Sequence, residues 1–238
     1  MLDTAKTVRE FAVEMPQATR VFEKLGIDYC CGGSKTLEQA CEAANLRLSE
    51  VMQSLDAATA PDASGADWNQ AALADLVAHI TDKHHNYVKS EVPRLESLTH
   101  KVCSVHGANH PELLEVQKVF RAVGGELSMH MMKEEQILFP YLVRMEQDVR
   151  SGCAIAPPPF GSVGNPIHMM MMEHDSAGEA LRELRRLTTD YAVPADACIS
   201  YQTLYRALLE FEADLHQHIH LENNILFPRA VEMENGRS

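Results

Sequence analysis

The sequence lacks any run of about 18 apolar residues, which a membrane-spanning helix would require. Its first residues also lack the basic segment and following apolar stretch that mark a secretory signal peptide. These two absences argue against a membrane protein and a secreted protein. We therefore expect a cytoplasmic protein.

Basic residues are scarce, and nowhere do they form a stripe. The chain has 21 Lys and Arg against 34 Asp and Glu, which gives a formal net charge of −13 over 238 residues. Such a chain repels the phosphates of nucleic acids. We expect no nucleic acid and no membrane among its partners.

Two further features are missing: a paired cysteine pattern and a convincing strand of alternating apolar residues. The cysteines are scattered, and without an export signal they are expected to be reduced thiols. They are Cys30, Cys31, Cys41, Cys103, Cys153 and Cys198. The periodicity that does occur is helical, so the sequence predicts an all-α fold.

One block occurs twice in the sequence. It consists of His130-x-x-x-Glu134 leading into Ile-Leu-Phe-Pro at 137–140, and His218-x-x-x-Glu222 leading into Ile-Leu-Phe-Pro at 225–228. A histidine and a glutamate four residues apart lie on one face of a helix, so both can reach the same cation. The duplication predicts two metal-binding helices that face each other.

The repeat extends upstream of both blocks. His84 precedes His130 by 46 residues, and His174 precedes His218 by 44 residues. Each half then supplies two helices, one with a histidine and one with the histidine-glutamate pair. Four helices with ligands directed inward form an up-down bundle with a central site.

The chain divides at a stretch of small and polar residues. We predict a small helical domain at 1–55, a linker at 56–67 and a four-helix bundle at 68–238. Short helices are expected near 3–14, 17–25, 37–44 and 50–55, with Gly26 ending the second and Thr36 and Ser49 capping the last two. Longer helices are expected at 69–104, 112–146, 167–191 and 196–233.

Helical phase narrows the choice of ligands. Successive members of the set His216, His218 and His220 point about 200° apart on a helix, so only one of them can pair with Glu222. The repeat selects His218. The same alignment selects Glu134 over Glu135. Around His84 the phase leaves His79 and His85 open as alternatives. An ordinary polar role is nevertheless favoured for seven histidines: His79, His85, His100, His110, His168, His216 and His220.

Four imidazoles and two bridging carboxylates would give each of two metal ions four protein bonds. A position would remain open for a small ligand. Mixed imidazole and carboxylate ligation suits iron, while manganese and zinc are also permitted.

These residues resemble the hemerythrin-like bundle of the repair-of-iron-centres family. The matching segments are His84, 130–140, Glu173-His174-Asp175 and 218–228. The segment Val21–Gly33, with Leu37 to Cys41, is similar to the small domain that precedes the bundle in that family. The resemblance thus covers nearly the whole chain, and it favours His84 over its neighbours.

The resemblance implies a di-iron site in which His84, His130, His174 and His218 are terminal ligands and Glu134 and Glu222 are bridges. It implies two iron ions per chain, joined by an oxo or hydroxo bridge, and a role in repairing iron-sulfur clusters damaged by nitric oxide or peroxide. Damaged iron-sulfur proteins, an unidentified electron donor, nitric oxide and dioxygen would be the partners.

Cys30 and Cys31 are adjacent, a spacing at which a mutual disulfide is strained. One interpretation is a pair of small buried residues in a turn beside Gly32 and Gly33. The other is a thiolate that takes part in redox chemistry or iron transfer near the bundle. The family resemblance favours the second.

Several hypotheses remain open on function. The protein donates iron to damaged clusters, or it removes nitric oxide reductively and would then be an enzyme. A different class is a hemerythrin-like carrier or sensor of dioxygen or nitric oxide. A ferritin-like oxidase ranks last, because such sites use Glu-x-x-His spacing. The predicted linker also permits an exchanged homodimer.

Overall fold

A computed structural model describes residues 3–30, 32–58 and 67–236. In these ranges the regular elements are helices, and the sole strand-like feature is an isolated bridge between Thr7 and Thr36. The all-α prediction is confirmed. The expected linker falls largely at residues 59–66, which lie outside the described ranges.

Four short helices form the N-terminal part: α1 (Val8–Glu14), α2 (Ala18–Leu25), α3 (Leu37–Ala43) and α4 (Leu48–Ala57). Thr7 and Thr36 each accept a hydrogen bond from the third residue of the helix that follows, in a capping box. Gly26 ends α2 with a φ of 67°, a left-handed conformation in which glycine is unstrained.

The sequence placed the start of α4 wrongly. Arg47, not Ser49, is the N-cap residue, and its side chain forms no capping hydrogen bond. The helix continues to Ala57, past the expected boundary at 55.

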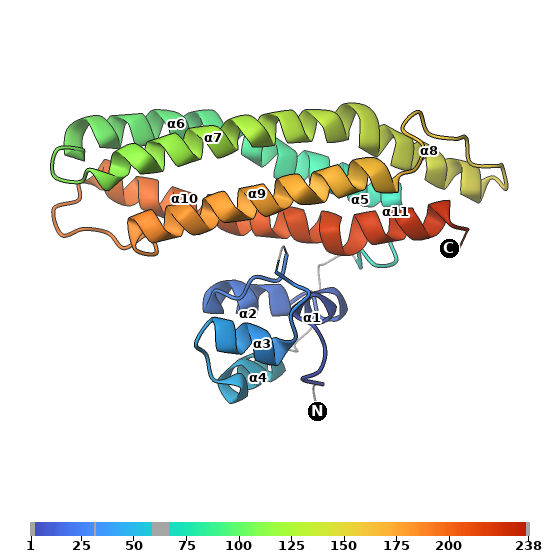
Figure 1. Cartoon of the computed structure of the whole chain (residues 1–238), viewed down its shortest axis with the longest axis horizontal. Helices are drawn as coiled ribbons and strands as arrows, with labels where there is room; N and C mark the ends of the chain where they lie inside the picture. Colours follow the sequence, from blue (N-terminus) through green and yellow to red (C-terminus); the bar gives the residue numbers. More distant parts are fainter. Residues whose placement is uncertain (1–2, 31, 59–66, 237–238) are drawn as a thin grey trace.

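The long helices form a four-helix bundle (Figure 1). Its four rods run up and down: α5 (Leu73–His79), η1 (Ile80–His85) and α6 (Asn86–His106); α7 (Glu112–Lys133), η2 (Glu134–Leu138) and α8 (Phe139–Arg150); α9 (Gly164–Thr188); and α10 (Ile199–His220), η3 (Leu221–Leu226) and α11 (Phe227–Glu234). The elements labelled η are single π-helical segments inside three of the rods.

Two apolar clusters fill the bundle. One surrounds Phe120 and Phe211, between α6, α7, α9 and α10, and the other surrounds Leu142 and Phe227, where α5, α8 and α11 meet. Between the two clusters each rod contributes buried histidine or glutamate side chains. This polar layer lies at the level of the three π segments.

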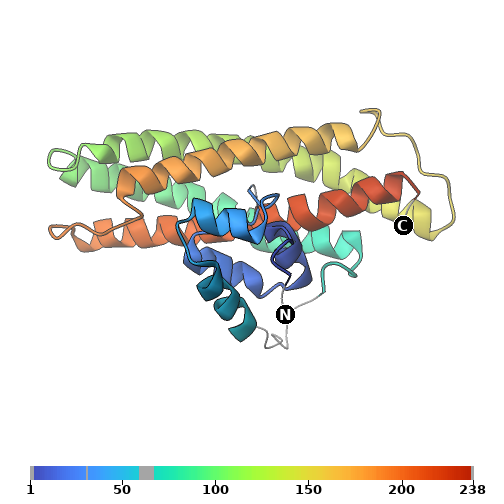
Figure 2. The same ribbon diagram turned by 60° about the horizontal axis from the view of Figure 1, so that its bottom comes forward.

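The N-terminal helices pack around a third apolar cluster that includes Phe11, Phe22 and Leu37. They lie against the α10 side of the bundle in both views (Figures 1 and 2). Tyr29 makes two of the polar contacts between them: its hydroxyl accepts from Gln217 at 2.7 Å, and its carbonyl accepts from Asn224 at 3.1 Å.

Candidate metal centre

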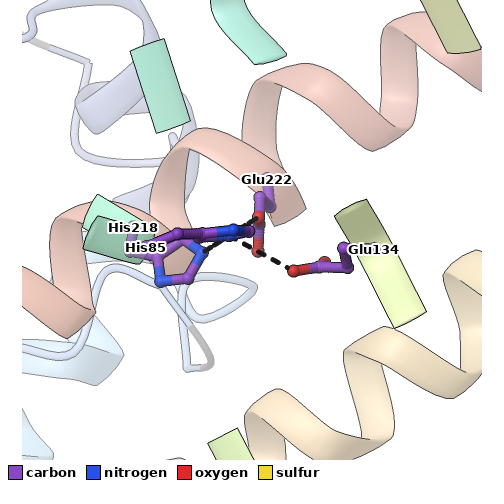
Figure 3. A group of neighbouring side chains, drawn as sticks. All are labelled: His85, Glu134, His218 and Glu222. Atoms are coloured by element: carbon purple, nitrogen blue, oxygen red, sulfur yellow. Dashed lines mark hydrogen bonds and ion pairs between the residues drawn. The ribbon is translucent and has the colours of Figure 1, made fainter. Parts of the chain in front are cut away.

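The polar layer contains two overlapping groups of side chains of the types that ligate metals. In each group, one nitrogen or oxygen atom from every member lies within 4.8 Å of the others. The groups are His85, Glu134, His218 and Glu222, and His130, Glu134, His174 and Glu222. The two carboxylates belong to both groups, so neighbouring cations would share them. Figure 3 shows the first group, with the carboxylates of Glu134 and Glu222 close to its imidazoles.

The helices change their hydrogen-bond pattern at this layer. η1 ends at His85, η2 begins at Glu134 and η3 includes Glu222. A π segment pairs residues five apart instead of four, and such segments are frequent at functional sites. Pro140 and Pro228 are the second residues after η2 and η3, and proline cannot donate to the carbonyl four residues back. The repeated Ile-Leu-Phe-Pro block therefore coincides with a local change in helix geometry beside each glutamate.

The structure places His85 in the first group, in the position expected for His84, which belongs to neither group. The Nδ1 atom of His84 donates to Asp214 Oδ1 at 3.0 Å, and its ring stacks on His218 with centroids 5.8 Å apart. Both histidines are buried because they follow Ile80 by four and five residues. In a π segment the residue five positions further along lies over the first residue. In a regular α-helix the residue four positions further along does so.

The other five predicted residues lie in the groups, as expected: His130, Glu134, His174, His218 and Glu222. Their role as ligands stays a prediction. Six histidines that were expected to lie elsewhere belong to neither group: His79, His100, His110, His168, His216 and His220.

The imidazoles approach one another in pairs. The Nε2 atoms of His85 and His218 are 3.0 Å apart, as are those of His130 and His174. Two neutral Nε2 atoms that both act as acceptors would repel at this distance, whereas a shared cation accepts both lone pairs.

The carboxylates have imidazole nitrogens as their close polar contacts. Glu134 Oε2 lies 3.2 Å from His130 Nε2, and the Glu222 oxygens lie 3.0 Å from His174 Nε2 and His218 Nε2. Both carboxylates are fully buried, which is costly unless nearby positive charge compensates it, and either a protonated imidazole or a coordinated cation supplies that charge. The donor set of the structure therefore fits a cation-binding site.

The negative charge of the two glutamates stabilises the protonated, positively charged form of the histidines beside them. Burial lowers the pKa of His85, but hydrogen bonds to Glu134 and Glu222 outweigh burial and raise this pKa to about 10. At His130 burial is likewise outweighed, mainly by the charge of Glu134, and the pKa rises to about 9. Burial raises the pKa of both glutamates, yet the neighbouring imidazoles lower it overall. Both are therefore carboxylates, as cation binding requires.

Two glutamates outside these groups, Glu135 and Glu173, orient two of the imidazoles in the same way. In each case Nδ1 donates to a glutamate, at 2.7 Å and 2.9 Å, and that glutamate forms an ion pair with a lysine. The chains are His85–Glu135–Lys89 and His130–Glu173–Lys133. Such partners fix the ring and increase its basicity as a ligand. Sequence reasoning excluded Glu135 as a ligand but found neither glutamate's supporting role.

Comparison with known proteins agrees with this geometry. Residues 77–230 match the family described as hemerythrin HHE cation binding domain, and residues 4–59 match a domain of unknown function, DUF542. A probable iron-sulfur cluster repair protein of Haemophilus influenzae is 39% identical over 93% of this chain and 95% of its own length.

Two further relatives are named iron-sulfur cluster repair protein YtfE. The one from Pectobacterium atrosepticum is 37% identical over 96% of this chain and 98% of its own length. The one from Yersinia pseudotuberculosis is 36% identical over 94% and 95%. The chain belongs to the hemerythrin-like family of iron-sulfur cluster repair proteins. The family resemblance found in the sequence is thereby confirmed.

Of the two adjacent cysteines, the structure describes Cys30. Cys30 is buried, its Sγ lies 3.4 Å from Asp28 Oδ1, and it lines a cavity of about 180 Å³ between α2, α9 and α10. Cys31 lies outside the described residues. Within the described ranges, no helix is long and apolar enough to cross a membrane.

Proposed function

We propose that this member of the repair family holds two iron ions in its polar layer and supplies iron to damaged iron-sulfur proteins. The observation that carries the proposal is the sharing of two buried carboxylates by two pairs of histidines. The proposed ligands are His85, His130, Glu134, His174, His218 and Glu222.

The charge of the ligand set supports this role. Four neutral imidazoles and two carboxylates carry −2, so two divalent cations would leave a net charge of +2 that attracts anions and small electron-rich molecules. Imidazole and carboxylate together suit iron, although manganese and zinc accept the same ligands. Iron bound here would supply redox chemistry and a binding position for dioxygen or nitric oxide.

The residues of the chain make iron transfer chemically reasonable. Neither group contains a thiolate, so removal of the ion requires protonation or displacement of imidazoles and carboxylates. Glu135 and Glu173 keep the Nδ1 protons of His85 and His130 in place, which leaves Nε2 of each ring as the ligand atom.

We also propose the division into a helical domain, a linker and a bundle at 68–238, with the first boundary moved from the expected 55 to Ala57, where α4 ends. Separate apolar clusters and separate family matches support it. Within this arrangement Cys30 and Cys31 would take part in redox chemistry or iron transfer. A cytoplasmic location and a homodimer stay predictions.

The ligand assignment is tested by metal content and optical spectra of protein from iron-supplemented cells. Wild type should contain two irons per chain, and Glu134→Ala, Glu222→Ala and His85→Ala should each lose iron. His84→Ala is the matched control and should retain both ions. Metal-free wild type, or loss of iron from His84→Ala alone, would contradict the assignment.

The function is tested by mixing the iron-loaded protein with an apo iron-sulfur protein, sulfide and a thiol reductant. Transfer of iron, seen as the cluster absorption of the acceptor, supports repair by donation. Tight binding of dioxygen or nitric oxide without iron loss would instead indicate a carrier or sensor. Consumption of nitric oxide with an electron donor would indicate a reductase.

A further inference from the structure

The four imidazoles of the metal centre differ in what holds their outer nitrogen. All four direct Nε2 toward the centre. Nδ1 contacts Glu135 from His85, Glu173 from His130 and Asn223 from His174, at 2.7, 2.9 and 2.8 Å. Nδ1 of His218 is fully buried and has no hydrogen-bond partner within the described part of the chain.

The two metal-ligating groups therefore differ in how well their histidines are held from outside. In the second group both His130 and His174 have outer partners, whereas in the first group only His85 has one. An outer partner fixes the ring of a ligating histidine, and its loss typically costs about 10–100-fold in metal affinity. We infer that the His85–His218 group holds its metal ion more weakly and gives it up first. The inference rests on the proposed function, since it requires two bound ions.

The structure also indicates why Nδ1 of His218 has no hydrogen-bond partner among the described residues. Asp214 precedes it by four residues on α10, a spacing at which side chains on a helix meet. The carboxylate of Asp214 instead accepts from Nδ1 of His84 at 3.0 Å, and its Oδ2 atom is buried without a hydrogen bond in the described ranges. His84 thus acts as a positioning residue that engages a carboxylate within reach of His218.

This side of the centre borders a cavity. A space of about 720 Å³ between the N-terminal helices and the bundle is lined by His84, Asp214 and Gln217, among others. His84 precedes His85 directly in the sequence, and its ring stacks on that of His218. The weaker group therefore has an aqueous region beside it through which a cation or a chelator can pass.

The test is the release of iron from the doubly loaded full-length protein to a ferrous chelator under anaerobic conditions. We expect two kinetic phases of equal amplitude. Glu135→Gln, which weakens support for His85, should accelerate only the fast phase by about 10-fold or more. Glu173→Gln, its counterpart beside His130, should accelerate only the slow phase. A general loss of structure would accelerate both phases, and far-UV circular dichroism checks it.

The positioning role of His84 has its own variants. His84→Phe keeps an aromatic ring but releases Asp214, which can then accept from His218, so the fast phase should slow by about 10-fold. Adding Asp214→Ala should abolish that slowing, because alanine offers His218 no acceptor. Should His84→Phe fail to fold, His84→Ala replaces it.

The outcomes separate the two proposals. Uptake of fewer than two metal ions by wild type would contradict the proposed function. Two ions released at one rate, acceleration of the fast phase by Glu173→Gln, or an unchanged fast phase in folded His84→Phe would overturn this inference alone. A Co²⁺ titration of the same variants, followed by its visible absorption, provides a readout independent of iron chemistry and should show the same order of affinities.

Discussion

Glu146, near the end of α8, caps the first two backbone amides of α5, those of Leu73 and Ala74. Its Oε1 accepts from the amide of Leu73 at 2.8 Å, and its Oε2 accepts from that of Ala74 at 3.0 Å. The N-cap residue, Ala72, has no side-chain acceptor of its own. A carboxylate from a distant rod therefore replaces the local cap and favourably opposes the helix dipole.

The second half of the bundle has an equivalent helix cap. Glu234 of α11 accepts from the amide of Val163 at 2.8 Å and from the hydroxyl of Ser162 at 2.7 Å, at the start of α9. Glu146 and Glu234 each follow the proline of the repeated block by six residues. The repeat thus extends to the caps that orient the neighbouring rods.

Replacement of Glu146 should destabilise the bundle. Glu146→Ala leaves two amides without an acceptor, one of them buried, so we expect the free energy of unfolding to fall by about 2 kcal/mol. Glu234→Ala should cost less, about 1 kcal/mol, because Glu234 is only half-buried. Urea denaturation measures both values. Equal losses would show that burial of the cap does not matter.

Gly124 of α7 packs against Val92 of α6. A Cβ atom at this position would stand 2.8 Å from Cγ1 of Val92, while one at Gly125 would meet no atom within 4 Å. Gly124→Ala should destabilise by about 1–3 kcal/mol through overpacking. The control Gly125→Ala should stabilise by about 0.5–1 kcal/mol because alanine favours the helix. Thermal unfolding separates the two, and Val92→Ala should restore much of the loss in the first variant.

The hydroxyl of Tyr29 joins the N-terminal helices to the bundle. It donates to Glu23 at 2.6 Å and accepts from Gln217 at 2.7 Å. Tyr29→Phe should lower the free energy of unfolding by about 1–2 kcal/mol, since Glu23 then loses a buried partner. A double-mutant cycle with Gln217→Ala measures the part of that loss that belongs to the interface. A coupling energy of zero would place the whole effect inside the N-terminal part.

Cys198 is an exposed thiol at the N-cap of α10. Hydrogen bonds from the amide of Tyr201 and from His106, whose Nε2 lies 3.1 Å from Sγ, lower its pKa. The thiolate is therefore present at lower pH than usual, so alkylation by iodoacetamide should reach its plateau at a lower pH. His106→Ala should shift the plateau to higher pH. Peptide mapping distinguishes Cys198 from Cys153, which is also exposed, and from the remaining cysteines.

The sequence predicted most of the architecture because its signals are local and repeated. The capping boxes at Thr7 and Thr36 and the stop at Gly26 depend on residues within one turn, although the box at Thr7 was found only in the structure. The four rods follow from helical periodicity, and the duplicated histidine-glutamate block placed Glu134 and Glu222 in one layer.

By itself, then, the sequence determined the fold class, the family and five of the residues that meet in the centre. Tertiary structure decided the rest, because it depends on contacts between rods. The π segment at Ile80–His85 brings His85 to the centre in place of His84, and regular helical phase could not reveal that change. His85 has an outer partner in Glu135, whereas Nδ1 of His218 has none among the described residues. Both facts depend on where side chains from separate rods meet, which residue spacing alone does not specify.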